Sequence, residues 1–184
     1  MPTDLPGIAQ LLRLSSTDST QAVARFLAEQ GAPDRTLVWA GLQTAGRGRM
    51  KRRWTSRAGG LYFSLILRPS SPPSRLADLS LAMAAAAAEA LTITGIATTV
   101  KPPNDVIGSR GRRSGKVCGI LAEASGGSRS VDWVVLGVGI NVNNSVSGVP
   151  GAASLKSLTG RAWEPAEVLR SFLKNFNEIY RAFR

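Results

Sequence analysis

The sequence contains no histidine and only one cysteine among its 184 residues. The absence of histidine excludes Ser-His-Asp and Cys-His catalysis and removes the commonest zinc ligand. The single Cys118 cannot form an internal disulfide, which is typical of a protein from a reducing compartment. Any catalysis must therefore use cations, backbone N–H groups, carboxylates or a bound metal ion. Nucleotidyl transfer is such a reaction, because positioning and charge neutralisation supply most of its rate.

Acidic and aromatic residues are also scarce. The chain has 23 Lys and Arg against 12 Asp and Glu, a net charge of +11, and only 6% aromatic residues. This balance suits nucleic acid, acidic small molecules or acidic protein partners. The cations concentrate in two loop-like segments, 47–57 and 110–116, and aromatic residues do not interleave with them as stacking platforms would. Direct nucleic-acid binding is therefore the second choice.

Two features bear on where the protein works. Residues 1–14 lack the basic-then-apolar layout of a signal peptide. The apolar stretch 79–91 is rich in alanine and carries Glu89, so we expect a buried helix rather than a membrane span. A chain that is 43% hydrophobic can bury a core, and we expect residues 1–184 to form a single domain. The prediction is a soluble cytoplasmic protein without membrane contact.

The hydrophobic periodicity predicts an α+β fold, in which a mixed β-sheet has helices packed mainly on one face. The helices are expected at 18–30, 77–91 and 164–183, and the strands at 36–42, 61–68, 98–101, 116–123 and 131–138. Segment 108–115, which is rich in Gly, Ser and Arg, is expected to be a loop.

Residues 43–54 (QTAGRGRMKRRW) are the most informative stretch of the chain. Gly46 and Gly48 let the backbone approach a ligand closely, while Arg47 and Arg49 supply guanidinium groups. Five cations fall within the seven residues 47–53, and Trp54 adds a flat stacking surface. Such a loop repels itself when empty and is relieved by a bound polyanion. On charge alone it would indicate a solvated basic loop or a nucleic-acid patch.

This loop and four further segments together resemble the biotin protein ligases. The segments follow the family's order over about residues 15–145 and read Asp18-Ser19-Thr20-Gln21, 43–54, Lys101-Pro102-Pro103-Asn104-Asp105, 116–123 (KVCGILAE) and 137–143 (GVGINVN). The resemblance implies the biotin/lipoate ligase catalytic fold, which is like that of class II aminoacyl-tRNA synthetases. It also implies an enzyme that uses ATP and Mg²⁺ to convert biotin to biotinyl-5′-AMP. The biotin then passes to a lysine of a biotin carboxyl carrier domain.

The resemblance assigns roles residue by residue. Arg49 and Lys116 are implied as catalytic cations that meet the biotin carboxylate and the α-phosphate. The implied biotin-binding residues are Ser19, Thr20, Gln21, Gln43, Gly46, Arg47, Gly48, Arg49, Lys116, Gly119, Gly137 and Gly139. The implied nucleotide-binding residues are Arg49, Trp54, Asn104, Lys116 and Asn141. Asp105 is a weak candidate for contacting Mg²⁺.

Several of these residues also have a simpler structural interpretation. Ser19 and Thr20 are good helix N-caps, and Asp105 and Asn141 are common turn formers. Trp54 alone would most often belong to a hydrophobic core.

The chain also departs from the family pattern. Pro102 stands where the family usually has Trp, and segment 108–115 is longer and more basic than expected. We expect no N-terminal winged-helix domain and no small C-terminal β-barrel, and a monomer or weak homodimer. The alternatives are a lipoate ligase or octanoyltransferase relative, and a basic nucleic-acid-binding module.

Overall fold

The computed structural model describes residues 5–183, which fold around one seven-stranded mixed sheet. Residues 1–4, part of the segment predicted to lack a signal peptide, and Arg184 lie outside the described residues. The strands are β1 (Gln10–Leu14), β2 (Thr36–Ala40), β3 (Leu61–Leu67), β4 (Ala97–Lys101), β5 (Asp105–Arg110), β6 (Arg113–Gly126) and β7 (Val131–Ile140). Their order across the sheet is β1-β2-β3-β7-β6-β5-β4. Only the β1–β2 pair is parallel.

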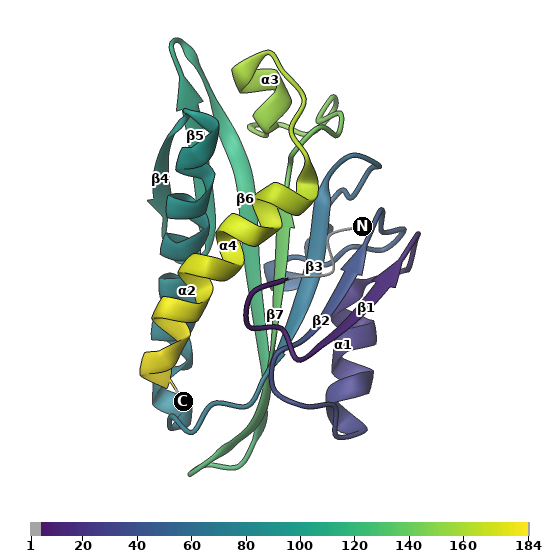
Figure 1. Cartoon of the computed structure of the whole chain (residues 1–184), viewed down its shortest axis with the longest axis vertical. Helices are drawn as coiled ribbons and strands as arrows, with labels where there is room; N and C mark the ends of the chain where they lie inside the picture. Colours follow the sequence, from purple (N-terminus) through teal and green to yellow (C-terminus); the bar gives the residue numbers. More distant parts are fainter. Residues whose placement is uncertain (1–4, 184) are drawn as a thin grey trace.

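The helices cover the two faces of the sheet unequally (Figure 1). α1 (Thr20–Glu29) packs on β2, β3 and β7, whereas α2 (Leu76–Leu91) and α4 (Pro165–Tyr180) pack together on the opposite face. The short α3 (Leu155–Thr159) lies beside β5 and β6. The predicted α+β fold with helices mainly on one face is confirmed, and all eight predicted elements are present with small shifts at their ends.

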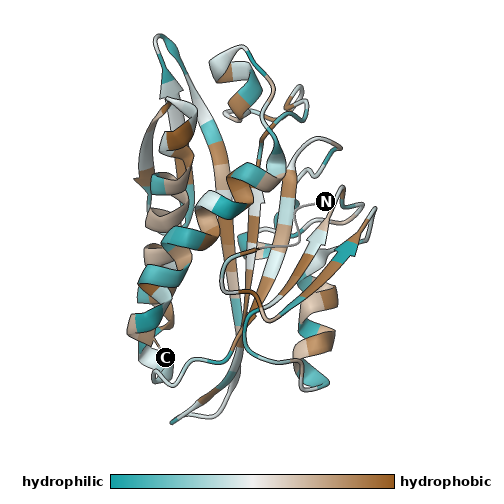
Figure 2. Cartoon of the chain, in the orientation of Figure 1, coloured by the Kyte–Doolittle hydropathy of each residue, from teal (hydrophilic) through white to brown (hydrophobic). Residues whose placement is uncertain are grey.

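β7 shows how the sequence divides the two faces. Val134, Leu136, Val138 and Ile140 point into the core that α2 and α4 cover, and that core is visible as the apolar centre of the sheet in Figure 2. Val135 points to the α1 face. Because side chains alternate along a strand, Gly137 and Gly139 also fall on the α1 face and leave it bare there. An open surface therefore lies beside the start of α1.

The apolar segment Pro73–Thr94, which contains α2, is long and apolar enough by composition to cross a membrane. Its apolar side chains are used within the fold, because Leu79, Met83 and Leu91 are buried in the core shared with α4. Tyr180 and two phenylalanines of α4 stack in a row on that core. The expectation of a buried helix over this stretch is confirmed.

The prediction of a loop at 108–115 is wrong. β5 and β6 continue through this segment as a hairpin whose two-residue turn is Gly111-Arg112, with Gly111 at φ 59°. Arg110 and Arg113 donate to the carbonyls of Thr159 and Ser157 in the last turn of α3. These guanidinium groups complement the negative end of that helix, so two of the three arginines in the segment have a structural role. β1, β5 and α3 were not predicted.

Candidate functional site

A cavity of about 350 Å³ opens on the α1 face, over the bare part of β7. A volume of this size suits a small organic ligand. Its walls come from the start of α1, the basic loop 46–53, β3, the 101–105 turn, β6 and β7. The lining includes these predicted site residues: Ser19, Thr20, Gln21, Gln43, Arg47, Gly48, Arg49, Trp54, Asn104, Asp105, Lys116, Gly119, Gly137 and Gly139.

Trp54 lies against the glycines of two neighbouring strands. A Cβ atom on Gly139 would come within 2.5 Å of Trp54 Nε1, and one on Gly119 within 2.8 Å of Cζ3. Only glycine at both positions lets the indole approach the sheet so closely. The ring lines the cavity, and its buried Nε1 has no hydrogen-bond partner within the described chain. Trp54 is therefore a cavity wall rather than part of the main hydrophobic core.

One end of the cavity carries neutral polar groups. Gln43 Oε1 accepts from Thr20 N at 2.8 Å and from Thr20 Oγ1 at 3.1 Å. Gln43 Nε2 donates to Ser56 Oγ at 2.7 Å, which fixes the amide in one orientation. Ser19 occupies the N-cap position of α1, but its hydroxyl makes no cap hydrogen bond and has no other partner in the described chain. A buried, unpartnered hydroxyl at a cavity wall is suited to a polar ligand.

Gln21 and Ser64 form the deep part of this polar end. Both are buried, and Ser64 Oγ lies 3.2 Å from Gln21 Oε1 and 3.0 Å from Thr20 Oγ1. The sequence analysis did not identify Ser64 as a site residue. The signal available was a single hydroxyl inside the otherwise apolar run of β3 (LYFSLIL), where an unpaired polar group would be costly.

The other end of the cavity is cationic. Lys116 Nζ lies 2.6 Å from Asp105 Oδ1 and 5.2 Å from the centre of the Trp54 ring. Arg49 donates to Asn104 Oδ1 at 3.2 Å, and Asn104 in turn donates to the carbonyl of Ile120. The two predicted catalytic cations, which are 67 positions apart in the sequence, thus line one cavity. Asp105 is an ion-pair partner of Lys116 here, which neither of its predicted roles anticipated.

The basic loop is folded over the cavity but only weakly held. Gly48 N donates to Arg52 O and Trp54 N to Gly46 O, while Arg53 donates to Thr44 O. Met50 and Lys51 adopt left-handed backbone conformations, with φ of 55° and 60°. Such conformations cost roughly 1 kcal/mol or more for each non-glycine residue. Met50 is also 81% exposed, so burial does not offset this cost.

Two predicted site residues do not line the cavity. Asn141 is buried, its Nδ2 donates to Lys116 O at 3.3 Å, and its Oδ1 accepts from Asn144. Each amide atom thus makes one hydrogen bond within the chain and keeps a second proton or lone pair, so the contact with a nucleotide stays a prediction. Gly46 lies behind the polar end, where a Cβ would come within 2.7 Å of Ser56 Oγ. In this structure its lack of a side chain leaves room for the Gln43–Ser56 hydrogen bond.

The fold carries a cavity with neutral polar groups at one end and cations at the other, an arrangement suited to a small ligand that is polar at one end and anionic at the other. The profile of the biotin/lipoate A/B protein ligase family matches residues 13–141. The chain belongs to this family.

Individual relatives agree with the family assignment. The bifunctional ligase/repressor BirA of Bacillus spizizenii is 40% identical over 172 residues, which is 90% of this chain and 52% of the relative. A biotin–acetyl-CoA-carboxylase ligase of Paracoccus denitrificans is 38% identical over 165 residues, which is 85% of this chain and 67% of the relative. The chain thus spans about half the length of the Bacillus BirA relatives that it matches.

The fold also matches solved structures. The biotin protein ligase of Aquifex aeolicus, determined in complex with biotin and ATP, superposes with a TM-score of 0.78 at 35% identity. The match covers 95% of this chain and 71% of that protein.

Proposed function

We propose that this chain is the catalytic part of an ATP-dependent biotin protein ligase. The observation that carries the proposal is the pairing, in one cavity, of a neutral polar end at Ser19, Thr20 and Gln43 with a cationic end at Arg49 and Lys116. Biotin has a neutral ureido ring at one end and a carboxylate at the other. The chain's relatives that are named as biotin ligases support the same activity, as does the Aquifex protein solved in complex with biotin and ATP.

The ureido ring is placed at the polar end. The buried hydroxyl of Ser19, which lacks a partner in the described chain, is available to hydrogen-bond the ring. The apolar part of biotin then lies along Gly119, Gly139 and the Trp54 ring, where no side chain of the strands intervenes. This direction brings the biotin carboxylate toward Lys116.

The first half-reaction joins two anions at the cationic end. An oxygen of the biotin carboxylate attacks the α-phosphorus of ATP, the bond to the β-phosphate oxygen breaks, and pyrophosphate leaves. Lys116 and Arg49 offset the repulsion between carboxylate and phosphate. To bind these substrate anions, Lys116 must break its ion pair with Asp105. In the second half-reaction, the amine of a carrier lysine attacks the acyl carbon and expels AMP.

Mg²⁺ is proposed to enter with ATP as part of the substrate. Among residues 5–183, no group of three or more His, Cys, Asp or Glu side chains is arranged to hold a metal ion. Asp105 supplies one carboxylate to the cavity lining. One carboxylate is compatible with Mg²⁺ that keeps several waters and is held mainly by phosphates. The nucleotide contacts proposed are Arg49, Trp54, Asn104, Lys116 and Asn141.

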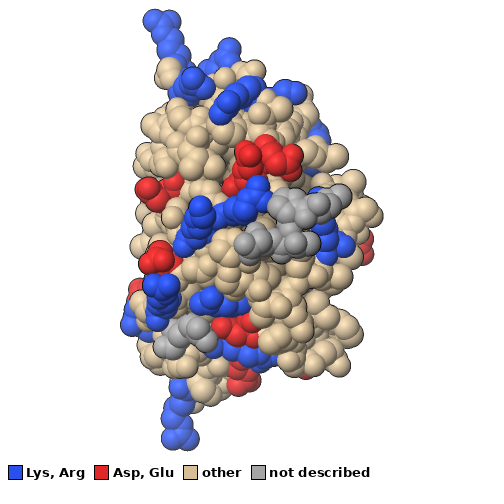
Figure 3. Space-filling view, viewed as in Figure 1, with Lys and Arg blue, Asp and Glu red and all other residues tan. Residues whose placement is uncertain are grey.

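The proposed protein partner is a biotin carboxyl carrier domain, and the proposed setting is the cytoplasm, with the chain as a monomer or weak homodimer. We propose no direct contact with nucleic acid. On the face seen in Figure 3, basic side chains lie in separate groups with acidic ones between them, rather than as one continuous surface.

Titration calorimetry with biotin, lipoate and a random oligonucleotide tests the ligand class. Biotin should bind and lipoate should bind at least about tenfold more weakly, because each buried polar group left unpaired costs about 1–3 kcal/mol. Equal heats for the two acids would remove the biotin assignment, and binding of the oligonucleotide alone would favour the nucleic-acid alternative. Pyrophosphate release from biotin and Mg·ATP tests the reaction.

A further inference from the structure

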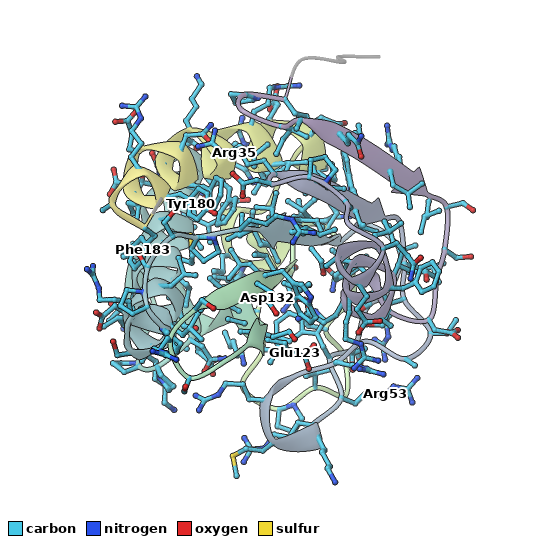
Figure 4. All side chains as sticks on the ribbon, turned by 90° about the horizontal axis from the view of Figure 1, so that it is seen from below. Arg35, Arg53, Glu123, Asp132, Tyr180 and Phe183 are labelled. Carbon is cyan, nitrogen blue, oxygen red and sulfur yellow. The ribbon has the colours of Figure 1, made fainter. Side chains whose placement is uncertain are left out.

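Glu123 on β6 is a carboxylate next to the cavity for which the proposed mechanism has no use. Figure 4 shows it on the side of the sheet away from α4, toward the part of the molecule that carries Arg53. Glu123 Oε2 accepts from Gln21 Nε2 at 3.1 Å, and the carbonyl of Val135 accepts from the same nitrogen at 3.0 Å. Both protons of the Gln21 amide are therefore used within the chain.

The opposite atom of the amide lies over the cavity floor. Gln21 Oε1 sits above Gly137, at a position that a Cβ on Gly137 would occupy. Ser64 Oγ lies 3.2 Å from Oε1 and can give its single proton either to this oxygen or to Thr20 Oγ1. Because a carbonyl oxygen has two lone pairs, Oε1 retains at least one for a ligand.

A flipped Gln21 amide would be unfavourable. Its oxygen would then face two hydrogen-bond acceptors, the Glu123 carboxylate and the Val135 carbonyl. Gln21 is 3% exposed, so water cannot relieve this contact. The Glu123 carboxylate, together with the Val135 carbonyl, therefore holds the amide in one of its two orientations.

We propose that Glu123 is a positioning residue that acts through Gln21, making the deep end of the cavity an acceptor for a ligand N–H group. The proposal rests on the proposed function, in which that group is a ureido N–H of biotin. A ligand whose ring presents only hydrogen-bond acceptors or apolar atoms would gain nothing from this orientation. Glu123 thereby contributes to ligand selection without touching the ligand.

The test is a double-mutant cycle with biotin affinity as the readout. Glu123→Ala should weaken biotin binding by about tenfold, the effect of one hydrogen bond. Gln21→Met removes the amide at nearly the same length. If Glu123 acts through Gln21, adding Glu123→Ala to Gln21→Met should change affinity by less than about twofold. Losses that multiply in the double variant would overturn the proposal.

Further measurements separate positioning from a general loss of structure. Glu123→Gln keeps an acceptor for Gln21 and should retain most of the affinity, and Glu178→Ala, an exposed glutamate that pairs with Arg181, is the matched control. The KM for biotin should rise in Glu123→Ala while the KM for ATP and kcat stay unchanged. If the wild-type chain fails to bind biotin, the proposed function is wrong. If it binds biotin and Glu123→Ala binds equally well, only the role of Glu123 is wrong.

Discussion

Lys116 Nζ and Asp105 Oδ1 form an ion pair of 2.6 Å at the base of the β5–β6 hairpin. The pair holds the ammonium group in the cavity while no substrate anion is bound. Both side chains are about one-third exposed or less, at 32% and 26%, so the pair adds only modestly to stability. Its effect should therefore be seen mainly in ligand binding.

Replacing Asp105 should reveal this competition. In Asp105→Asn, Lys116 no longer has to break an ion pair when biotin binds. Biotin alone should therefore bind up to about fivefold more tightly, which corresponds to the roughly 1 kcal/mol of a partly exposed ion pair. The KM for Mg·ATP should rise, since the proposed contact with Mg²⁺ is lost. Calorimetry without ATP and steady-state kinetics with varied Mg·ATP measure the two effects. Weaker binding of biotin alone would contradict the competition.

Removing the ammonium group should affect chemistry more than binding. Lys116→Ala should lower pyrophosphate release from biotin and Mg·ATP by about 100-fold or more, while biotin affinity falls far less, because the cation is needed most where carboxylate and phosphate converge. Lys156→Ala, an exposed lysine on α3, serves as the control. Unchanged pyrophosphate release in Lys116→Ala would show that the role given to Lys116 is wrong.

The absence of a side chain at Gly139 of β7 should be essential for the position of the Trp54 ring. In Gly139→Ala, the new Cβ would lie 2.5 Å from Trp54 Nε1, so the ring must move and biotin affinity should fall by about tenfold or more. Gly127→Ala in the β6–β7 turn is the matched control, because a Cβ there meets no atom within 4 Å. Equal affinities of the two variants, measured by calorimetry, would argue against Trp54 as a wall of the biotin site.

The basic loop should be mobile before ligand binds. It carries five cations between positions 47 and 53 and two residues in left-handed conformations, so its closed form is weakly held. Trypsin should cut within 47–53 quickly in the free protein and slowly with biotinyl-5′-AMP bound. Arg35, which precedes Thr36 of β2, is an internal control, because its side chain is only 18% exposed and donates to Asn177 Oδ1, so it should be cut only on unfolding. Equal cleavage rates in both states would contradict loop closure.

The buried thiol makes a separate prediction about alkaline pH. Burial raises the pKa of the Cys118 thiol from 9.0 to about 12, with Lys116 lowering it and Asp105 raising it by smaller amounts. The thiol should therefore react with a disulfide reagent at pH 8 only after unfolding. The pKa of this thiol is higher in the folded than in the unfolded chain. Its contribution to the free energy of unfolding is therefore fully present below pH 9 and is lost as the pH rises toward 12. The loss is at most about 1.4 kcal/mol per pH unit.

The matched variant isolates this thiol from other groups that titrate at alkaline pH. Between pH 9 and 11, the free energy of unfolding of Cys118→Ala, measured with urea, should fall less steeply than that of the wild-type chain. The same slope for both proteins would mean that Cys118 ionises without unfolding.

Much of the fold and of the site could be predicted because the relevant signals are local. The apolar runs of β3 and β7 and the helical period of α4 depend on residues close in sequence, and the motif residues Arg49, Asn104 and Lys116 line one cavity. What the sequence could not show depends on contacts between distant segments. Ser64 becomes a site residue only because α1 brings Thr20 and Gln21 over β3.

The wrong prediction for segment 108–115 has the same origin. Its composition is typical of a loop, and the hydrogen bonds from Arg110 and Arg113 to α3 join residues more than 40 positions apart, so they could not be inferred from composition. For Asn141, the family motif suggests a contact with the nucleotide, whereas its hydrogen bonds to the carbonyl of Lys116 and the side chain of Asn144 become visible only in the structure.

The alternation along β7 restricts how the protein can change in evolution. Inserting or deleting one residue in this strand would turn the glycines toward the core and the branched residues into the ligand cavity, so folding and binding would be lost together. A point substitution affects only one face of the strand. A change at Leu136 would affect core packing, whereas a change at Gly137 would affect the binding site. Length variation among relatives should therefore collect in the 127–130 turn, while β7 keeps its length.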